Sequence, residues 1–264
     1  MLIVGELINA SRRGIEEAVR GRDRDFIIDL ARQQANSGAT HIDVNAGTLM
    51  DGEPEALEWL VQVIQEEMDV PICIDSPNPA AIEAALKVHQ GPALVNSISA
   101  ERERYESIIP LVKQYDSLVV ALCMGDTEIP HTTEERVSIA DELIQELKRD
   151  GIPTENIYFD PLVQPISTST DNGLIVLDAI HAIMRKYPEA HTICGLSNIS
   201  FGLPYRKLLN RDFLVMALAR GLDGVILDPL DSEIMSALHS SKVLLDRDEY
   251  CIGYISAFRE GLLK

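Results

Sequence analysis

Short apolar segments recur along the 264-residue chain at intervals of about 30 residues, the usual length of one strand-plus-helix unit. In these segments Val, Ile and Leu occupy consecutive positions, which is typical of strands buried on both faces of a parallel sheet. Eight segments share the pattern: 2–7, 41–45, 71–75, 93–96, 117–124, 156–160, 192–197 and 224–228. Eight such strands with helices between them predict an α/β fold, a closed (β/α)8 TIM barrel.

Amphipathic helices are predicted between the apolar segments. Three stripes have the spacing of a helix with one apolar face: Leu57, Leu60, Val61 and Ile64; Ile27, Leu30, Ala31 and Gln34; and Leu174, Leu177, Ile180 and Met184. Thr132 and Glu135 predict a capping box at the start of another helix. The turn at 76–79 predicts a helix that begins near Ala80.

A barrel of this class takes about 250 residues, so we expect one domain over residues 1–264. The main alternative is an open, doubly wound sheet, which usually carries a glycine-rich phosphate loop after its first strand. Here the first apolar segment continues into Leu7-Ile8-Asn9-Ala10, which contains no glycine. The sequence therefore favours the closed barrel.

The charge of the chain excludes several partners. The 42 acidic and 23 basic residues give a net charge of -19, which disfavours both nucleic acid and an anionic membrane surface. No apolar stretch is long enough to span a bilayer, and the N-terminal residues resemble a strand more than a signal peptide. Cys73, Cys123 and Cys194 lie in apolar segments, as reduced and buried cysteines do. We therefore expect a cytoplasmic protein.

An acid, an amide or a hydroxyl follows or ends almost every apolar segment. These residues are Glu6, Asn9, Asp43, Asn45, Asp75, Asn96, Ser97, Asp126, Asp160, Ser197, Asn198 and Asp228. In a barrel the carboxyl ends of all strands face one mouth, which is where active sites lie. A single Asp or Asn at a strand end is more often a helix cap or a turn former, and that reading stays open for Asp43, Asp126 and Asp228.

The chemistry of this set points to an organic ligand. The six histidines lack zinc-site spacing, and no lysine stands at a strand end, which disfavours zinc and Schiff-base chemistry. We expect no bound metal, although magnesium held by carboxylates and substrate phosphates stays open. Carboxylates and primary amides suit a flat heterocycle with donors and acceptors along one edge, and a pterin has such an edge.

The same residues carry a family resemblance over essentially the whole chain. The matching segments are Gly5-Glu6-Leu7-Ile8-Asn9, Asp43-Val44-Asn45, Ile74-Asp75-Ser76, Val95-Asn96-Ser97, Ala100-Glu101-Arg102, Asp160-Pro161-Leu162, Gly195-Leu196-Ser197-Asn198-Ile199-Ser200 and Leu209-Asn210-Arg211. The chain resembles the pterin-binding methyltransferases that move a methyl group between tetrahydrofolate and a corrinoid protein. It is also similar to the folate-binding barrel of cobalamin-dependent methionine synthase.

The resemblance implies a role for each matching residue. Asp75, Asn96 and Asp160 match positions that hydrogen-bond the pterin ring. Asn198 matches the amide that approaches N5 of the folate, where it would act as a preorganised dipole in catalysis. Four further residues match substrate-binding positions at the same rim: Glu6, Asn9, Ser197 and Arg206.

One position departs from the family pattern. The acetogenic branch has Gln three residues after the catalytic Asn, where this chain has Phe201, an aromatic residue that can stack on a ring of the substrate. The difference favours transfer from a methylated corrinoid to tetrahydrofolate in a demethylation pathway. Transfer from 5-methyltetrahydrofolate to a corrinoid/iron–sulfur protein in acetyl-CoA synthesis is the alternative.

The resemblance also implies a partner, because the chain lacks the D-x-H-x-x-G pattern of corrinoid domains. We expect a separate corrinoid-binding protein to supply the cobalamin cofactor, and we expect a homodimer formed through barrel helices. Two other functions stay open. A dihydropteroate synthase would need a basic anchor for pyrophosphate, which the strand ends do not offer. A non-catalytic pterin-binding protein would leave Asn198 unexplained.

Overall fold

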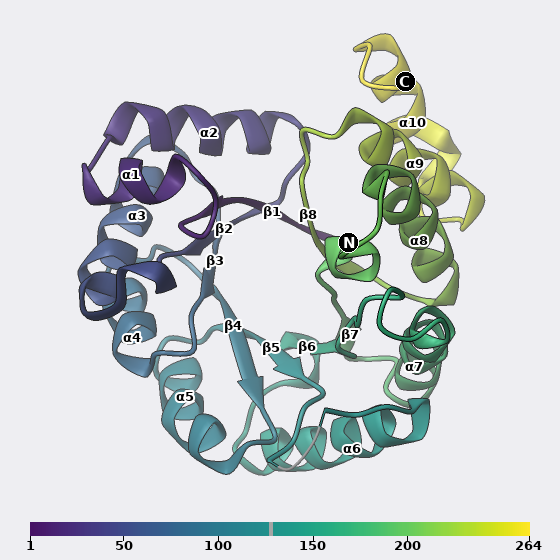
Figure 1. Ribbon diagram of the computed structural model, residues 1–264, viewed down its shortest axis with the longest axis horizontal. Coiled ribbons are helices and arrows are strands. Elements are labelled where there is room, and N and C mark those ends of the chain that lie inside the picture. Colours follow the sequence, from purple (N-terminus) through teal and green to yellow (C-terminus); the bar gives the residue numbers. More distant parts are fainter. Residues whose placement is uncertain (127–128) are drawn as a thin grey trace.

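The computed structural model describes residues 1–126 and 129–264. Eight parallel strands form one sheet in the order β7-β6-β5-β4-β3-β2-β1-β8. The strands are β1 (Leu2–Asn9), β2 (His41–Asn45), β3 (Ile72–Asp75), β4 (Leu94–Ser99), β5 (Leu118–Leu122), β6 (Ile157–Asp160), β7 (His191–Thr192) and β8 (Gly224–Leu227). A parallel bridge between Gly195 and Ile226 joins the two ends of this order and closes the (β/α)8 barrel (Figure 1).

Helices surround the barrel in an outer ring (Figure 1). They are α1 (Ile15–Arg20), α2 (Arg24–Asn36), α3 (Glu53–Glu67), α4 (Pro79–Val88), α5 (Arg102–Gln114), α6 (Thr133–Arg149), α7 (Asn172–Lys186), α8 (Arg206–Arg220), α9 (Ser232–Leu244) and α10 (Ile252–Arg259). Short 3-10 turns also occur: η1 (Gly47–Gly52), η2 (Thr154–Asn156), η3 (Leu196–Ser200) and η4 (Glu249–Cys251). Among the described residues, none of these helices is long and apolar enough to cross a bilayer.

The helix-start predictions are confirmed. Thr132 accepts a hydrogen bond from the Glu135 backbone N–H, and the Glu135 side chain completes the capping box of α6. Asn78 caps α4 by accepting from the Ala80 N–H at 3.0 Å. Each cap satisfies backbone donors that the first helical turn leaves free.

Two sequence predictions differ from the structure. The sequence predicts a strand over 192–197, but β7 ends at Thr192, because the chain turns into η3 at Leu196. Leu174 was placed on the buried stripe of α7, yet 63% of it is exposed. It lies in the first turn of the helix, and the buried face instead includes Val176, Leu177, Ile180 and Ile183.

Two layers of apolar side chains hold the barrel together. The first lies between the sheet and the helices, where Ile42 and Val44 of β2 pack with Leu57, Leu60 and Ile64 of α3. The second fills the barrel itself and consists of Leu2, Val4, Cys73, Leu94, Val120 and Ile193, packed with Leu118, Tyr158 and Ile226. Polar side chains continue this interior column toward the carboxyl ends of the strands, so the barrel is apolar inside and polar at its mouth.

Candidate active site

A continuous row of amides and carboxylates crosses the ends of the first four strands. Asn9 of β1 pairs in register with Asn45 of β2, and Asp75 of β3 pairs with Asn96 of β4. The Asn45 side-chain amide donates to Asp75 Oδ2 at 2.9 Å, which joins the two pairs. The predicted residues Asn9, Asp75 and Asn96 therefore come together at one side of the mouth. The side-chain oxygen Oδ1 of Asn9 is partly engaged, since it accepts from the Ser11 N–H at 3.0 Å.

The surroundings of Asp75 act on its ionisation in opposite directions. Burial raises the pKa of its carboxyl, while the hydrogen bond from Asn45 and the nearby Arg104 guanidinium lower that pKa in part. Arg104 is itself held in place, because its Nε donates to the Ser97 carbonyl at 2.9 Å. Asp75 is thus a carboxyl with one amide donor and one neighbouring cation already in position.

Asp160 faces the mouth from the end of β6. Its Oδ1 accepts from the Leu162 N–H at 2.8 Å and so stabilises a turn in which Leu162 has a left-handed backbone, φ 61°. The fully buried Arg136 of α6 supports the turn by donating to the Pro161 carbonyl at 2.7 Å. Burial raises the pKa of the Asp160 carboxyl to about 7, so its charge changes near neutral pH.

Glu6 reaches the mouth because β1 is irregular between Gly5 and Ile8. The Leu7 N–H in this irregular stretch donates to Gln34 Oε1 at 3.0 Å, and Gln34 of α2 is completely buried. A Cβ atom on Gly5 would lie 2.5 Å from Gln34 Oε1, so only glycine leaves room for this support. Glu6 forms a 2.5 Å ion pair with Arg12, and burial raises the pKa of its carboxyl.

Asn198 lies on η3, the turn that replaces the end of the seventh strand, and it is exposed. Its backbone N–H donates to the Gly195 carbonyl at 3.4 Å. A Cβ atom at Gly195 would come within 3.2 Å of the Asn198 amide nitrogen. The glycine therefore leaves space for the orientation that this amide adopts at the rim.

Ser197, Arg206 and Phe201 form the rim beside Asn198. Arg206 donates to the Ser197 carbonyl at 2.6 Å and to Ser200 Oγ at 3.0 Å, so it braces η3. Its guanidinium lies 5.7 Å from the centre of the exposed Phe201 ring. Phe201 is therefore an exposed ring that directly follows η3.

Sequence reasoning did not single out Asn45 or Arg104 as site residues. Asn45 carried a signal, since it ends a predicted strand, but the hydrogen bond to Asp75 depends on the register of β2 and β3. No sequence pattern identified Arg104 as a site residue, because it lies on α5 and reaches the mouth only through the packing of that helix against β4.

Asp43, Asp126 and Asp228, for which the sequence also allowed a capping role, differ in what their side chains contact. Asp126 accepts from the Arg102 N–H at 3.3 Å, at the start of α5, and Asp228 accepts from the Leu230 N–H at 2.9 Å in a turn. Asp43 caps nothing in the described chain: it is only 3% exposed and lies within the barrel. Among the described residues no group of three or more His, Cys, Asp or Glu is arranged to hold a metal ion.

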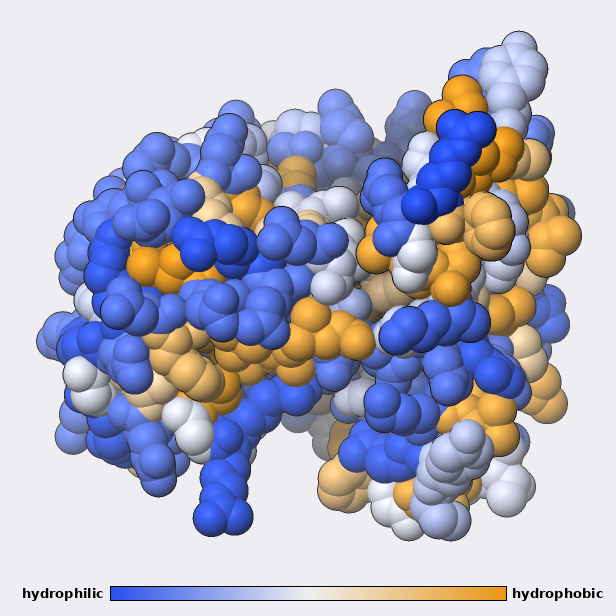
Figure 2. All heavy atoms as spheres, turned by 90° about the horizontal axis from the view of Figure 1, so that it is seen from above, coloured by the Kyte–Doolittle hydropathy of each residue, from blue (hydrophilic) through white to orange (hydrophobic). Residues whose placement is uncertain are grey.

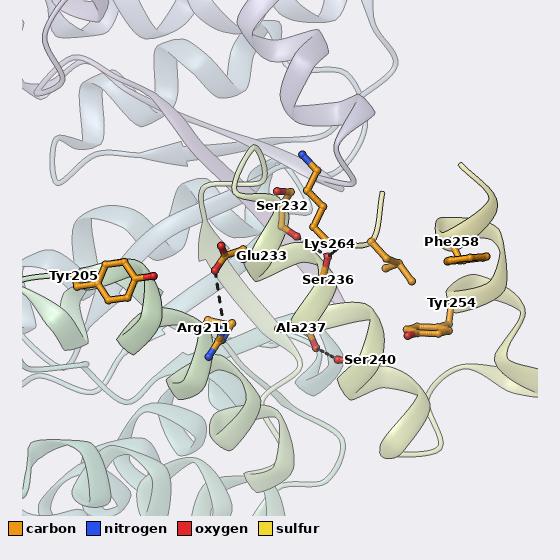
Figure 3. A pocket seen from close by; sticks show the side chains of 11 residues that line it. Tyr205, Arg211, Ser232, Glu233, Ser236, Ala237, Ser240, Tyr254, Phe258 and Lys264 are labelled. Carbon is orange, nitrogen blue, oxygen red and sulfur yellow. Dashed lines mark hydrogen bonds and ion pairs between the residues drawn. The ribbon is translucent and has the colours of Figure 1, made fainter. Parts of the chain in front are cut away.

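Several cavities adjoin the mouth, and a larger one lies outside the barrel. A cavity of about 340 Å³ beside β1 and β8 includes Glu6, Arg12, Ser197, Arg206 and Lys207 in its lining. A second, of about 790 Å³, lies between α9, α10 and the start of α8 (Figure 3). Figure 3 shows Tyr254 and Phe258 of α10 on one side of it and Arg211 of α8 on the other. None of the predicted site residues lines this outer cavity.

Comparison with known proteins gives a family, one relative matched over nearly its whole length and a longer relative matched in part. The family described as pterin binding enzyme matches residues 5–228. The chain is 37% identical over 263 residues to a methylcorrinoid:tetrahydrofolate methyltransferase of Eubacterium limosum, covering 99% of this chain and 97% of that protein. It is 28% identical over 257 residues to methionine synthase of Mycobacterium tuberculosis, covering 92% of this chain and 21% of that longer protein.

Solved structures show the same fold at low sequence identity. A Yersinia pestis DHPS solved with a pterine-sulfa conjugate and the 7,8-dihydropteroate synthase of Vibrio fischeri each superpose with a TM-score of 0.73. Each is 16% identical to this chain, and 93% of both chains is covered. At that identity the likeness supports the barrel architecture alone.

Proposed function

Since this chain belongs to the pterin binding enzymes, we propose that it is a methyltransferase that moves a methyl group from a methylated corrinoid protein to N5 of tetrahydrofolate. The arrangement that carries the proposal is the convergence of Asp75, Asn96 and Asp160 on one mouth with Asn198 at its rim. The likeness to the E. limosum enzyme over nearly its whole length supports this direction over acetyl-CoA synthesis.

Asp75, Asn96 and Asp160 are proposed to hold the pterin ring. A pterin presents an amino group and a ring N–H as adjacent donors, and an ionised carboxylate accepts both. Asp75 and Asp160 each offer such a carboxylate, and Asn96 offers both a donor and an acceptor to the remaining ring edge. The hydrogen bond from Asn45 orients Asp75 before the substrate arrives, which lowers the entropy lost on binding.

Asn198 is proposed as the catalytic residue at N5. As N5 of tetrahydrofolate forms a bond to the methyl carbon, the bond from that carbon to the partner's cobalt breaks and leaves its electron pair on the cobalt. Positive charge develops on N5, and its proton is released to solvent. The Asn198 carbonyl oxygen can accept a hydrogen bond from that N–H as its acidity increases. The exposed position of Asn198 on η3 supports this role, since it leaves the amide at the rim.

The rim residues are proposed to hold the rest of the folate. Tetrahydrofolate carries a carboxylate tail, and the 340 Å³ cavity is lined by Arg12, Arg206 and Lys207 together with Glu6, Asp228 and Asp231. Arg12 and Lys207 form ion pairs with Glu6 and Asp231, so Arg206 is the guanidinium proposed to receive the tail. Ser197 and Glu6 also line this cavity, Asn9 ends β1 at the same mouth, and the exposed Phe201 ring can stack on the aromatic ring of the tail. In this placement the pterin end of the folate lies in the mouth, and its carboxylate end lies in the cavity.

The corrinoid is proposed to come from a partner protein, and its cobalt supplies the methyl group. For that transfer the partner must cover the mouth. Met50, Phe201 and Leu230 support such a contact, because all three are exposed apolar residues in loops that follow strands of the barrel. Apolar side chains of this kind exclude water from a transient interface.

A homodimer through the outer helices is the further partner we propose. Exposed apolar residues occur on two outer helices that both pack against α9: Leu208, Val215 and Met216 of α8, and Ile252, Ile255 and Phe258 of α10. Figure 2 shows hydrophobic side chains concentrated on this side of the molecule. Exposed apolar side chains on this side of the barrel favour burial against a second copy. We place the enzyme in the cytoplasm, where its buried thiols stay reduced.

The test is a spectroscopic assay with purified protein, tetrahydrofolate and methylcobalamin. Loss of the methylcobalamin absorbance together with formation of 5-methyltetrahydrofolate, dependent on the protein, is the expected result. Tight binding of tetrahydrofolate without turnover, even with candidate corrinoid proteins supplied, would instead identify a non-catalytic pterin-binding protein.

A further inference from the structure

Asp43 occupies the barrel interior one layer below the candidate pterin site. It lies on β2 between Ile42 and Val44, which face the helices, so its side chain points into the barrel. In register it pairs with Cys73 of β3, a member of the apolar interior layer, whereas Asn45 two residues later reaches Asp75. Asp43 therefore stands where the apolar interior meets the polar mouth.

The Asp43 carboxyl has little to stabilise a charge. Its Oδ1 has no hydrogen-bond partner among the described residues, and the Cys73 thiol is the side chain within hydrogen-bonding reach. The charged groups that face it are Asp75 on β3, Glu6 on β1 and Arg12 in the loop after β1. Burial and the neighbouring Asp75 both raise the pKa of Asp43 well above its usual range.

Asp75 is in a better position to carry a charge than Asp43. It accepts the 2.9 Å hydrogen bond from Asn45 and lies near the Arg104 guanidinium. Two buried carboxyls that repel each other do not both ionise, and the proton stays on the group with fewer donors. An unpaired carboxylate inside the barrel is also costly to desolvate. The geometry thus favours a neutral Asp43 and a charged Asp75.

We propose that Asp43 is a positioning residue that stays protonated beneath the pterin site and leaves Asp75 as the carboxylate that receives the pterin N–H groups. The role of Asp75 here rests on the proposed function, while the proton on Asp43 does not. If Asp43 ionised at high pH, its charge would compete with Asp75 for the same donors, and folate binding would weaken.

Infrared spectroscopy of the unliganded protein tests the proton directly. A protonated carboxylic acid has a carbonyl-stretch band that a carboxylate lacks. At neutral pH, Asp43→Asn is expected to lose one such band relative to the wild type, and Asp25→Asn, at an exposed position on α2, is expected to lose none. No band loss in Asp43→Asn would overturn the proposal. Asp43→Ser, smaller and also neutral, makes the same prediction if the amide variant does not fold.

Tetrahydrofolate titrations by calorimetry test the consequence for Asp75. Asp43→Asn is expected to bind within about threefold of the wild type at neutral pH and to lose the weakening at alkaline pH that we expect for the wild type. An unchanged alkaline limb, or a loss of more than about tenfold at neutral pH in a folded variant, would contradict the assignment. A wild-type protein that binds no tetrahydrofolate would count against the proposed function, since the infrared result needs no ligand.

Discussion

The Asn45 side-chain amide donates to Asp75 Oδ2 at 2.9 Å, so one strand end orients the acid on the next. Asn45→Ala is expected to raise the dissociation constant for tetrahydrofolate about tenfold, the usual effect of losing one hydrogen bond to a charged group. Calorimetry measures this change. Asn45→Asp should bind still more weakly, because a second carboxyl then faces Asp75, and an unchanged affinity in both variants would exclude the orienting role.

Asn198→Ala separates catalysis from binding. We expect tetrahydrofolate affinity to change by less than about tenfold and methyl transfer to fall by ~10²-fold or more, as when an enzyme loses a donor or acceptor used in the transition state. Single-turnover rates and calorimetry on one preparation distinguish the two effects. Asn36→Ala, at the far end of α2, serves as the matched control. Wild-type turnover in Asn198→Ala would eliminate this residue as the catalytic group.

The carboxyl of Asp160 predicts a pH dependence, since burial raises its pKa to about 7. Only the ionised form accepts two N–H bonds from a pterin, so affinity should increase as pH rises from about 6 to 8. Calorimetry in buffers of different ionisation enthalpy should also detect proton release on binding near neutral pH. Asp160→Asn should lose both effects.

The same shift in the Asp160 pKa lowers stability in the unliganded protein as pH rises. The folded protein holds a proton that the unfolded chain releases at its lower pKa, so this contribution to stability is lost between about pH 4 and pH 7. Melting curves of the wild type and Asp160→Asn over that range check the sign. A variant with the same slope as the wild type would show that Asp160 does not titrate there.

Gly5 is expected to resist substitution although its backbone is not strained. The added Cβ of Gly5→Ala would lie 2.5 Å from Gln34 Oε1 and would displace the acceptor of the Leu7 N–H. Chemical denaturation should show a loss of about 1–3 kcal/mol, the cost of a buried donor without a partner. Gly52→Ala, where the nearest atom is 4.0 Å away, should be close to neutral. Equal stabilities of the two variants would argue against the Gln34 support.

The exposed apolar side chains on α8 and α10 predict the oligomeric state. The wild type should sediment as a dimer, and Met216→Asp with Phe258→Asp should raise the dimer dissociation constant by ~10²-fold or more, because each substitution buries a charge in the interface. Phe26→Asp, an exposed apolar position on α2, is the control. A monomeric wild type, or a double variant that remains dimeric, would rule out this interface.

Much of the architecture could be predicted because each barrel strand has a recognisable pattern in its own local sequence. Strands buried on both faces need continuous Val, Ile and Leu, and eight such segments were visible with polar residues at their ends. The seventh was overextended, since nothing local distinguishes a strand end from the turn that forms η3. The stripe on α7 misplaced Leu174, because helical spacing alone does not reveal which neighbours cover the first turn.

The sequence by itself determined the barrel, the mouth and the types of polar side chain at it, because each depends on one strand at a time. Only the tertiary structure decided which of those groups meet. The register of β2 against β3 places Asn45 on Asp75, and the packing of α5 brings Arg104 beside the same acid. It also moved Asp43 from a possible cap to a buried acid, since burial and charge repulsion arise only when the strands close around it.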